Sequence, residues 1–166
     1  VPVRTGLDLT PEILIPCSQH PNFIGIKEFA GNERIAAYEK QGIACWSGND
    51  DEAHDGRHFF GSHGVISVTS NLVPGIMRQL IDTPNEALNL RVQPLMNWLF
   101  CEPNPIAINT ALMMTNAVKP VFRLPYVPLS HSQREIGLSL MNEWTETDLV
   151  GGKATHLSDD VFCLTA

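Results

Sequence analysis

Lys27 is the residue of this chain whose surroundings best suit covalent chemistry. It lies in Phe23-Ile24-Gly25-Ile26-Lys27-Glu28, an apolar run about as long as one strand. Because side chains alternate across a strand, Lys27 shares a face with Gly25, which leaves space beside the amine. A partly desolvated lysine has a lowered pKa and attacks a carbonyl carbon to form a Schiff base. The alternative is a strand-end lysine whose ammonium reaches water.

The first half of the chain is predicted to alternate strands with helices. The opposite face of the Lys27 strand, with Ile24, Ile26 and Glu28, is expected to pack beneath helices. Residues 1–6 are expected to be a strand end that runs into a turn. Further strands are predicted at 43–47 and 65–68, and helices at 10–19, at 32–40 and from an Asn49 cap to about residue 60. After residue 68 only helices are expected, at 73–81, 86–100, 106–116 and 131–146, with an extended loop at 123–128 and a surface tail after 151–152.

This pattern predicts an α/β fold with a parallel sheet. Strands that are apolar on both faces and that alternate with amphipathic helices are typical of such sheets. A repeat near 20 residues, with glycine-rich turns after the strands, favours a (β/α)₈ barrel over an open doubly wound sheet. A complete barrel takes roughly 250 residues, whereas this chain has 166. The sequence therefore predicts either a small open sheet or the later part of a barrel.

The composition excludes several classes of function. A net charge of −7 without a Lys/Arg cluster argues against a nucleic-acid partner. No apolar stretch approaches the roughly 20 residues that span a membrane. The four cysteines, Cys17, Cys45, Cys101 and Cys163, are widely spaced and are predicted to be buried thiols in a reducing compartment.

Six motifs in order resemble those of the dihydrodipicolinate synthase (4-hydroxy-tetrahydrodipicolinate synthase) family, with the plant enzymes as the best match. They are Val1-Pro2-Val3-Arg4-Thr5-Gly6, Ile24-Gly25-Ile26-Lys27-Glu28 with Gly31-Asn32, Trp46-Ser47-Gly48-Asn49-Asp50-Asp51, the run from Gly64 to Asn71, Glu102-Pro103-Asn104-Pro105 and Arg123-Leu124-Pro125. The resemblance implies a class I aldolase-type lyase of the lysine (diaminopimelate) biosynthesis pathway. In this family a barrel lysine, matched by Lys27, condenses with pyruvate, and the resulting enamine attacks L-aspartate 4-semialdehyde. The covalent Schiff base implies that no metal or separate cofactor is needed.

The resemblance also assigns roles to three further residues. Arg4 matches an arginine near the site entrance that binds the carboxylate of the aldehyde substrate, a task that suits a guanidinium fork; its alternative role is a surface ion pair. Gly48 and Ile66 match positions that line the pyruvate pocket. The family is homotetrameric, and its plant members are in the plastid (chloroplast stroma); otherwise a cytoplasmic location is implied.

Some family features are not in this sequence. The proton-relay tyrosine, the paired threonines that hold the pyruvate carboxylate, and the tyrosine from a neighbouring subunit belong to the first half of the family's sequence. Pro16 within the first helix also departs from the family. We therefore expect the C-terminal part of a TIM (β/α)₈ barrel, about three to four βα units in residues 1–84, followed by a helical region in residues 85–166. With open strand edges, this portion is expected to self-associate and to lack synthase activity alone.

Two other functional hypotheses remain open, and the sequence contains one competing candidate site. The chain could belong to another pyruvate-dependent class I aldolase, such as N-acetylneuraminate lyase, or be a non-catalytic half barrel. His54 and His58, four residues apart with His63 beyond them, have a spacing that suits zinc. A solvated helix face is the favoured interpretation, because no catalytic glutamate follows the first histidine. No metal site is therefore predicted.

Overall fold

The computed structural model of the chain describes residues 1–166, apart from the side chain of Val3. The chain forms two compact units. The first contains Val1–Ser67 and Leu80–Pro84, and the second contains Val68–Gln79 and Asn85–Ala166. Helix α5 (Pro74–Asp82) contributes residues to both. No helix among the described residues is long and apolar enough to cross a membrane.

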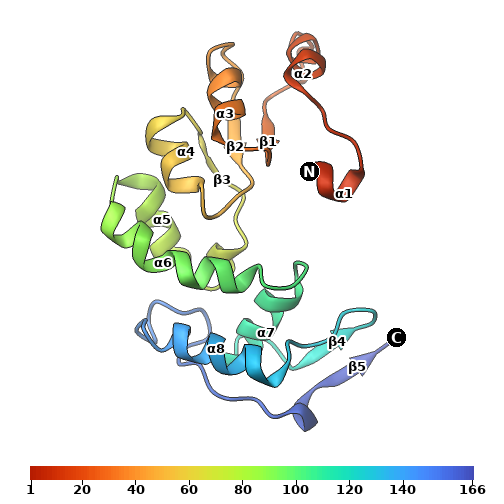
Figure 1. Cartoon of the computed structure of the whole chain (residues 1–166), viewed down its shortest axis with the longest axis vertical. Coiled ribbons are helices and arrows are strands. Elements are labelled where there is room, and N and C mark those ends of the chain that lie inside the picture. Colours follow the sequence, from red (N-terminus) through yellow and green to blue (C-terminus); the bar gives the residue numbers. More distant parts are fainter. The chain divides into compact units, whose positions relative to one another are not determined.

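The first unit is built on a parallel three-stranded sheet in the order β1-β2-β3 (Figure 1). The strands are β1 (Ile26–Glu28), β2 (Cys45–Ser47) and β3 (Gly64–Val65). Helix α3 (Asn32–Glu39) joins β1 to β2, and α4 (Ala53–Phe59) joins β2 to β3. Right-handed crossovers between sequential parallel strands place both helices on the same face of the sheet. Helix α3 contacts β2, α4 contacts β3, and the two helices contact each other.

The helix-covered face of the sheet is well buried. Cys45 and Ser47 are buried, and with Ile35 and Tyr38 of α3 the Cys45 side chain belongs to an apolar cluster. Gly42 follows α3 with a left-handed φ of 70°, a conformation typical of a glycine after a helix. The predicted strand–helix alternation of this part of the chain is therefore confirmed, although each strand is shorter than predicted.

The N-terminal segment differs from its prediction. Residues 1–6 form helix α1 (Pro2–Thr5) instead of a strand end, with Pro2 at its first position and Gly6 in a left-handed conformation at its end. Helix α2 (Pro11–Cys17) lies within the predicted range 10–19, begins after its N-cap residue Thr10 and continues through Pro16. Proline fixes φ at a helical value, so Pro2 favours a helix start as readily as an extended segment.

Two further local predictions are wrong. Ile24 was expected beneath helices, but its side chain is 84% exposed, because β1 begins only at Ile26, whose N–H donates to the Ala44 carbonyl at 3.0 Å. Asn49 does not cap α4; its side-chain amide donates to the Phe29 carbonyl at 3.3 Å and to Glu52 at 3.1 Å.

The second unit is mainly helical. Its principal helices are α6 (Glu86–Leu99), α7 (Ile106–Met114) and α8 (His131–Met141), and a short 3₁₀ helix, η1 (Thr69–Asn71), precedes α5. Helix α6 is capped by Asn85, whose side chain accepts the Leu88 N–H at 3.0 Å, and α8 is capped by Ser130. The apolar stripe of α6 is buried at Val92, Leu95, Met96 and Leu99.

The C-terminal segment was predicted as a loop and a surface tail, but it contains a second, two-stranded sheet. Strand β4 (Val121–Arg123) pairs in parallel with β5 (Cys163–Thr165), which follows the short 3₁₀ helix η2 (Asp159–Val161). Strand β5 is exposed along its length, so it has no burial pattern that the sequence could reveal.

The cysteines also differ from the prediction. Cys45 is buried, but Cys17, Cys101 and Cys163 are exposed, and all four are free thiols. Burial raises the pKa of the Cys45 thiol to about 11.

Candidate active site

Three of the four predicted site residues lie at the carboxyl ends of the parallel strands. Lys27 is the central residue of β1, Gly48 directly follows β2, and Ile66 directly follows β3. In the strand register, Lys27 pairs with Trp46 and Trp46 pairs with Gly64, so these three residues share one face of the sheet. Gly48 is two residues after Trp46 and Ile66 is two residues after Gly64, so both lie on the same face as Lys27. The Ile66 N–H donates to the Ser47 carbonyl at 2.9 Å, which holds Ile66 beside the end of β2.

The Lys27 side chain lies directly on Gly48. A Cβ atom added to Gly48 would be 2.7 Å from Lys27 Cε, 2.9 Å from Phe29 Cδ2 and 3.1 Å from the Glu28 carbonyl oxygen. These distances are below van der Waals contact, so only glycine leaves room for the lysine in this position. The glycine beside the amine is therefore Gly48, whereas the sequence suggested Gly25, whose added Cβ would meet Trp46 and the Ala44 carbonyl.

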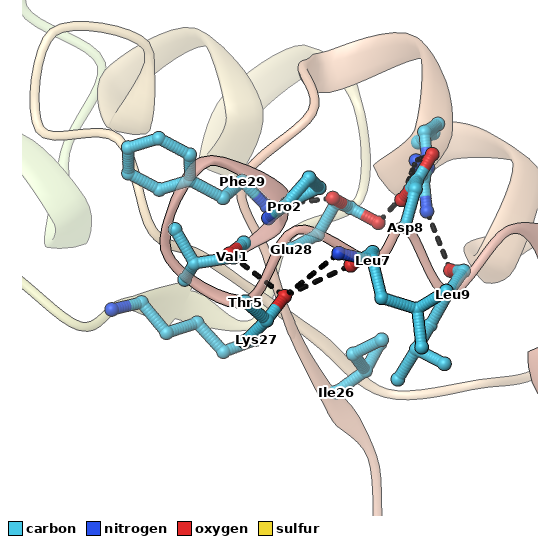
Figure 2. Close-up of a pocket in the computed structure, with 11 residues that line it drawn as sticks. Val1, Pro2, Thr5, Leu7, Asp8, Leu9, Ile26, Lys27, Glu28 and Phe29 are labelled. Carbon is cyan, nitrogen blue, oxygen red and sulfur yellow. Dashed lines mark hydrogen bonds and ion pairs between the residues drawn. The ribbon is translucent and has the colours of Figure 1, made fainter.

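Lys27 is exposed in this structure, although partial desolvation was expected. It stands on the face of the sheet that α3 and α4 leave open, and Ile66 on the same face is 52% exposed. Helix α1 lies beside β1: Val1, Pro2 and Thr5 line one open cavity of about 320 Å³ together with Lys27 (Figure 2). Arg4 lies on the same short helix but is not one of the described residues that line this cavity.

A buried carboxylate fixes the strand that carries Lys27. Glu28, 5% exposed, accepts hydrogen bonds from the backbone N–H groups of Phe29 at 2.6 Å and Ala30 at 2.7 Å. Its other oxygen forms an ion pair with Arg34 Nε at 3.1 Å. Glu28 and Lys27 are neighbours on opposite faces, so this network holds the end of β1 from the helix side.

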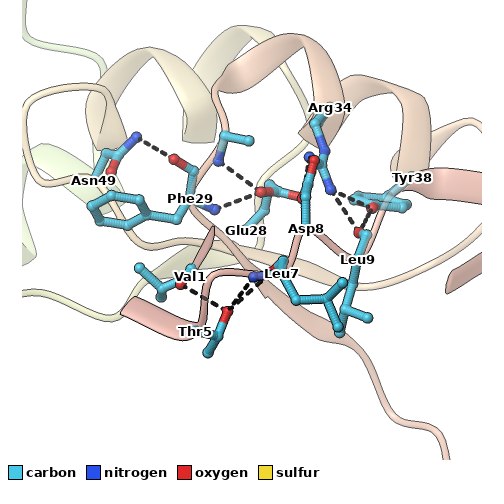
Figure 3. A network of polar contacts seen from close by, with 11 residues as sticks. Val1, Thr5, Leu7, Asp8, Leu9, Glu28, Phe29, Arg34, Tyr38 and Asn49 are labelled. Carbon is cyan, nitrogen blue, oxygen red and sulfur yellow. Dashed lines mark hydrogen bonds and ion pairs between the residues drawn. The ribbon is translucent and has the colours of Figure 1, made fainter. Parts of the chain in front are cut away.

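Arg34 connects this strand to the N-terminal segment (Figure 3). Its guanidinium donates to both Asp8 carboxylate oxygens at 2.9 Å and to the Leu9 carbonyl at 2.7 Å. Burial alone would lower the pKa of Arg34, but the hydrogen bonds to Tyr38 and Asp8 and the Glu28 charge raise it above its usual value. The guanidinium therefore stays charged and bridges the Asp8 and Glu28 carboxylates.

The polar network and the amine are directed apart. In Figure 2 the Lys27 amine extends away from the side on which Asp8 and Glu28 lie. The carboxylates therefore serve the position of β1 and the N-terminal segment, while the amine remains available to a ligand. Sequence reasoning did not identify Asp8 or Arg34. The available signal was the pair of Glu28, which ends the strand on the side expected to face helices, and an arginine on the next helix.

The histidine pair of α4 is not on a solvated helix face. His54 is only 2% exposed, its Nδ1 lies 2.8 Å from Asp55 Oδ1, and its ring contacts His58 edge to face at 4.9 Å. His58 Nε2 lies 2.8 Å from the Leu80 carbonyl oxygen. Both rings thus have protein contacts that serve the packing of α4.

Comparisons with known proteins agree with this geometry. Residues 1–142 match the model of the dihydrodipicolinate synthetase family. The chain is 49% identical over 161 residues to the chloroplastic 4-hydroxy-tetrahydrodipicolinate synthase of Nicotiana tabacum, covering 96% of this chain and 45% of that protein. It is 50% identical to the chloroplastic synthase 1 of Arabidopsis thaliana, of which it covers 44%. The chain thus spans less than half the length of these curated relatives.

Solved structures give the same result for the fold. The dihydrodipicolinate synthase of Acinetobacter baumannii complexed with pyruvate superimposes with a TM-score of 0.78 at 31% identity, over 86% of this chain and 53% of that chain. The enzyme of Cyanidioschyzon merolae with lysine bound superimposes with a TM-score of 0.74 at 29% identity, over 86% of this chain and 52% of that chain. The predicted fold class, the C-terminal part of a (β/α)₈ barrel with a helical region after it, is confirmed.

The strand-end arrangement of Lys27, Gly48 and Ile66 thus occurs on the fold that the sequence motifs implied. With the match over residues 1–142 and the similarity to the plant proteins, these observations show that the chain belongs to the dihydrodipicolinate synthetase family.

Proposed function

We propose that this chain carries the Schiff-base lysine of a 4-hydroxy-tetrahydrodipicolinate synthase, which condenses pyruvate with L-aspartate 4-semialdehyde in lysine biosynthesis. Lys27 is the proposed catalytic residue. The observation that carries the proposal is the contact between the Lys27 side chain and Gly48, at the strand ends where (β/α)₈ enzymes place their chemistry.

The chemistry follows from the amine. The Lys27 nitrogen attacks the keto carbon of pyruvate, and loss of water leaves a C=N bond. When this nitrogen is protonated, it withdraws electrons, so a proton leaves the pyruvate methyl group and an enamine forms. The enamine carbon then attacks the aldehyde carbon of the second substrate. This sequence uses a covalent link to the protein and needs no separate cofactor.

The other proposed residues bind the substrates. Gly48 gives pyruvate and the lysine space at the strand end, and Ile66 provides an apolar wall for the methyl group. Arg4, on the helix that borders the Lys27 cavity, is proposed to bind the carboxylate of the aldehyde substrate. The names of the plant relatives support a location in the chloroplast, and a homotetramer is proposed from the family resemblance.

The test is a synthase assay on a chimera. Because the chain spans 45% of the tobacco relative, this chain would replace the 161 matching residues of that protein. The chimera is expected to condense the two substrates, and the 166-residue chain assayed alone is expected to be inactive. Lys27→Arg should abolish the activity of the chimera, and Lys40→Arg, which changes an exposed lysine on the same unit, should leave it intact.

Two results would contradict the proposal. If the Lys27→Arg chimera keeps its activity, the amine is not the nucleophile. If the chimera is inactive with L-aspartate 4-semialdehyde but releases pyruvate from N-acetylneuraminate, the chain belongs to a lyase with a different acceptor.

A further inference from the structure

We propose that His131, Glu135 and His156 form a zinc-binding site that fastens the C-terminal segment to helix α8. All three residues belong to the second unit, so the proposal is independent of the synthase chemistry. Their three ligand atoms lie within 4.8 Å of one another.

The distances suit a single small cation. His131 Nδ1 lies 3.4 Å from His156 Nε2, and His156 Nε2 lies 3.0 Å from Glu135 Oε1. Zinc binds histidine nitrogen at about 2.0–2.1 Å in tetrahedral geometry, which places two ligand atoms about 3.4 Å apart. The two imidazole nitrogens therefore already have the separation that zinc requires, and the Glu135 carboxylate, within 4.8 Å of both, supplies the third ligand.

Two of the ligands are placed by a helix. His131 is the first residue of α8, and Glu135 follows four residues later, so both side chains lie on one face, one turn apart. The Ser130 side chain accepts the Gln133 N–H and caps the helix at the residue before His131. Neither ligand therefore depends on a loop.

The third ligand is held between two anchors. On one side, the Thr155 N–H donates to the Met114 carbonyl at 2.8 Å. On the other side, Asp159 forms an ion pair with Arg134, whose guanidinium also donates to the Leu129 carbonyl at 2.6 Å. The segment that presents His156 is thus fixed against α7 and α8 before any ion binds, which lowers the entropic cost of forming the site.

The ligand set favours zinc over the common alkaline-earth ions. Two imidazole nitrogens and one carboxylate oxygen suit zinc, whereas calcium and magnesium prefer oxygen ligands. A water molecule would complete the tetrahedron, because all three side chains are exposed. The ion would link residues 131 and 156 and thereby stabilise the end of the chain that leads into β5.

The proposal can be tested by calorimetric titration of the chimera with zinc chloride, because the 166-residue chain alone is expected to self-associate. The parent would carry serine at the exposed cysteines Cys17, Cys101 and Cys163, so that thiols do not contribute binding. We expect one zinc per chain. His156→Gln and Glu135→Gln should each weaken binding by at least about tenfold. Zinc should also raise the melting temperature of the parent and have no such effect on His156→Gln.

Two matched controls separate this site from general metal affinity. His20→Gln removes an exposed histidine of the first unit, and Glu146→Gln removes an exposed carboxylate of the second. Both should bind zinc as the parent does. Equal melting temperatures without zinc would show that the variants are folded, and His131→Asn repeats the test if one of them is not.

The proposal is overturned if the parent shows no saturable binding below about 0.1 mM zinc. It is equally overturned if His156→Gln, Glu135→Gln and His131→Asn all bind zinc with the affinity of the parent.

Discussion

Replacing Gly48 by alanine is expected to slow the capture of pyruvate by Lys27 without unfolding the protein. The new Cβ would lie 2.7 Å from Lys27 Cε, whereas carbon atoms in contact are about 3.5–4.0 Å apart. The lysine end must therefore move by about 1 Å. A displacement of this size from the reacting position costs on the order of 100-fold in rate. Crowding against Phe29 and the Glu28 carbonyl adds about 1–3 kcal/mol of destabilisation.

The assay is the rate of borohydride-trapped pyruvate adduct in the chimera, compared with its urea unfolding curve. Gly75→Ala is the control, because a Cβ there has no neighbour within 4 Å, and it should trap pyruvate at the parent rate. If Gly48→Ala traps pyruvate as fast as the parent, the proposed role of the Lys27–Gly48 contact is refuted. A fully unfolded Gly48→Ala would refute the expectation of a local effect.

Three further predictions concern stability. Arg34→Met leaves the buried Glu28 carboxylate without its ion pair and should lower the free energy of unfolding in urea by about 3 kcal/mol. Adding Glu28→Gln should restore part of this stability, and a loss under about 1 kcal/mol in Arg34→Met would contradict this interpretation. Burial raises the pKa of Cys45 from 9.0 to about 11, so the folded state keeps a proton that the unfolded state releases, and stability should fall by about 2 kcal/mol from pH 9 to 11. The same pH slope in Cys45→Ala would disprove this prediction. Gly137→Ala places a Cβ against the Trp98 ring and should lower stability by about 2–3 kcal/mol. An unchanged melting temperature would show that α6 and α8 do not pack this closely.

The sequence was most informative where local signals agreed with the fold. The βα units around β1 and β2 follow from apolar runs bounded by turns, as at Gly42 after α3. Family motifs identified Lys27, Gly48 and Ile66 together, and the strand register then brings them to one face. The motifs do not depend on long-range contacts, so they were accessible from the sequence, whereas the register pairs residues 18–19 apart and comes from the structure.

Features that depend on distant residues were not predicted. The pairing of β4 with β5 joins residues about 40 apart, and the exposed β5 has no alternating pattern. The Asp8–Arg34–Glu28 network also closes over a long separation. His131 and Glu135 have a four-residue spacing that could have been noticed, but His156 joins them only through the folded C-terminal segment.

The central claim is that the amine of Lys27 forms a Schiff base with pyruvate. The most direct measurement is borohydride reduction of the chimera in the presence of pyruvate, followed by peptide mass spectrometry. The claim predicts that the Lys27 peptide gains the mass of pyruvate less one water plus two hydrogens, while the peptides with Lys40, Lys119 and Lys153 stay unmodified. An adduct on another lysine, or no adduct in a chimera that makes product, would contradict it.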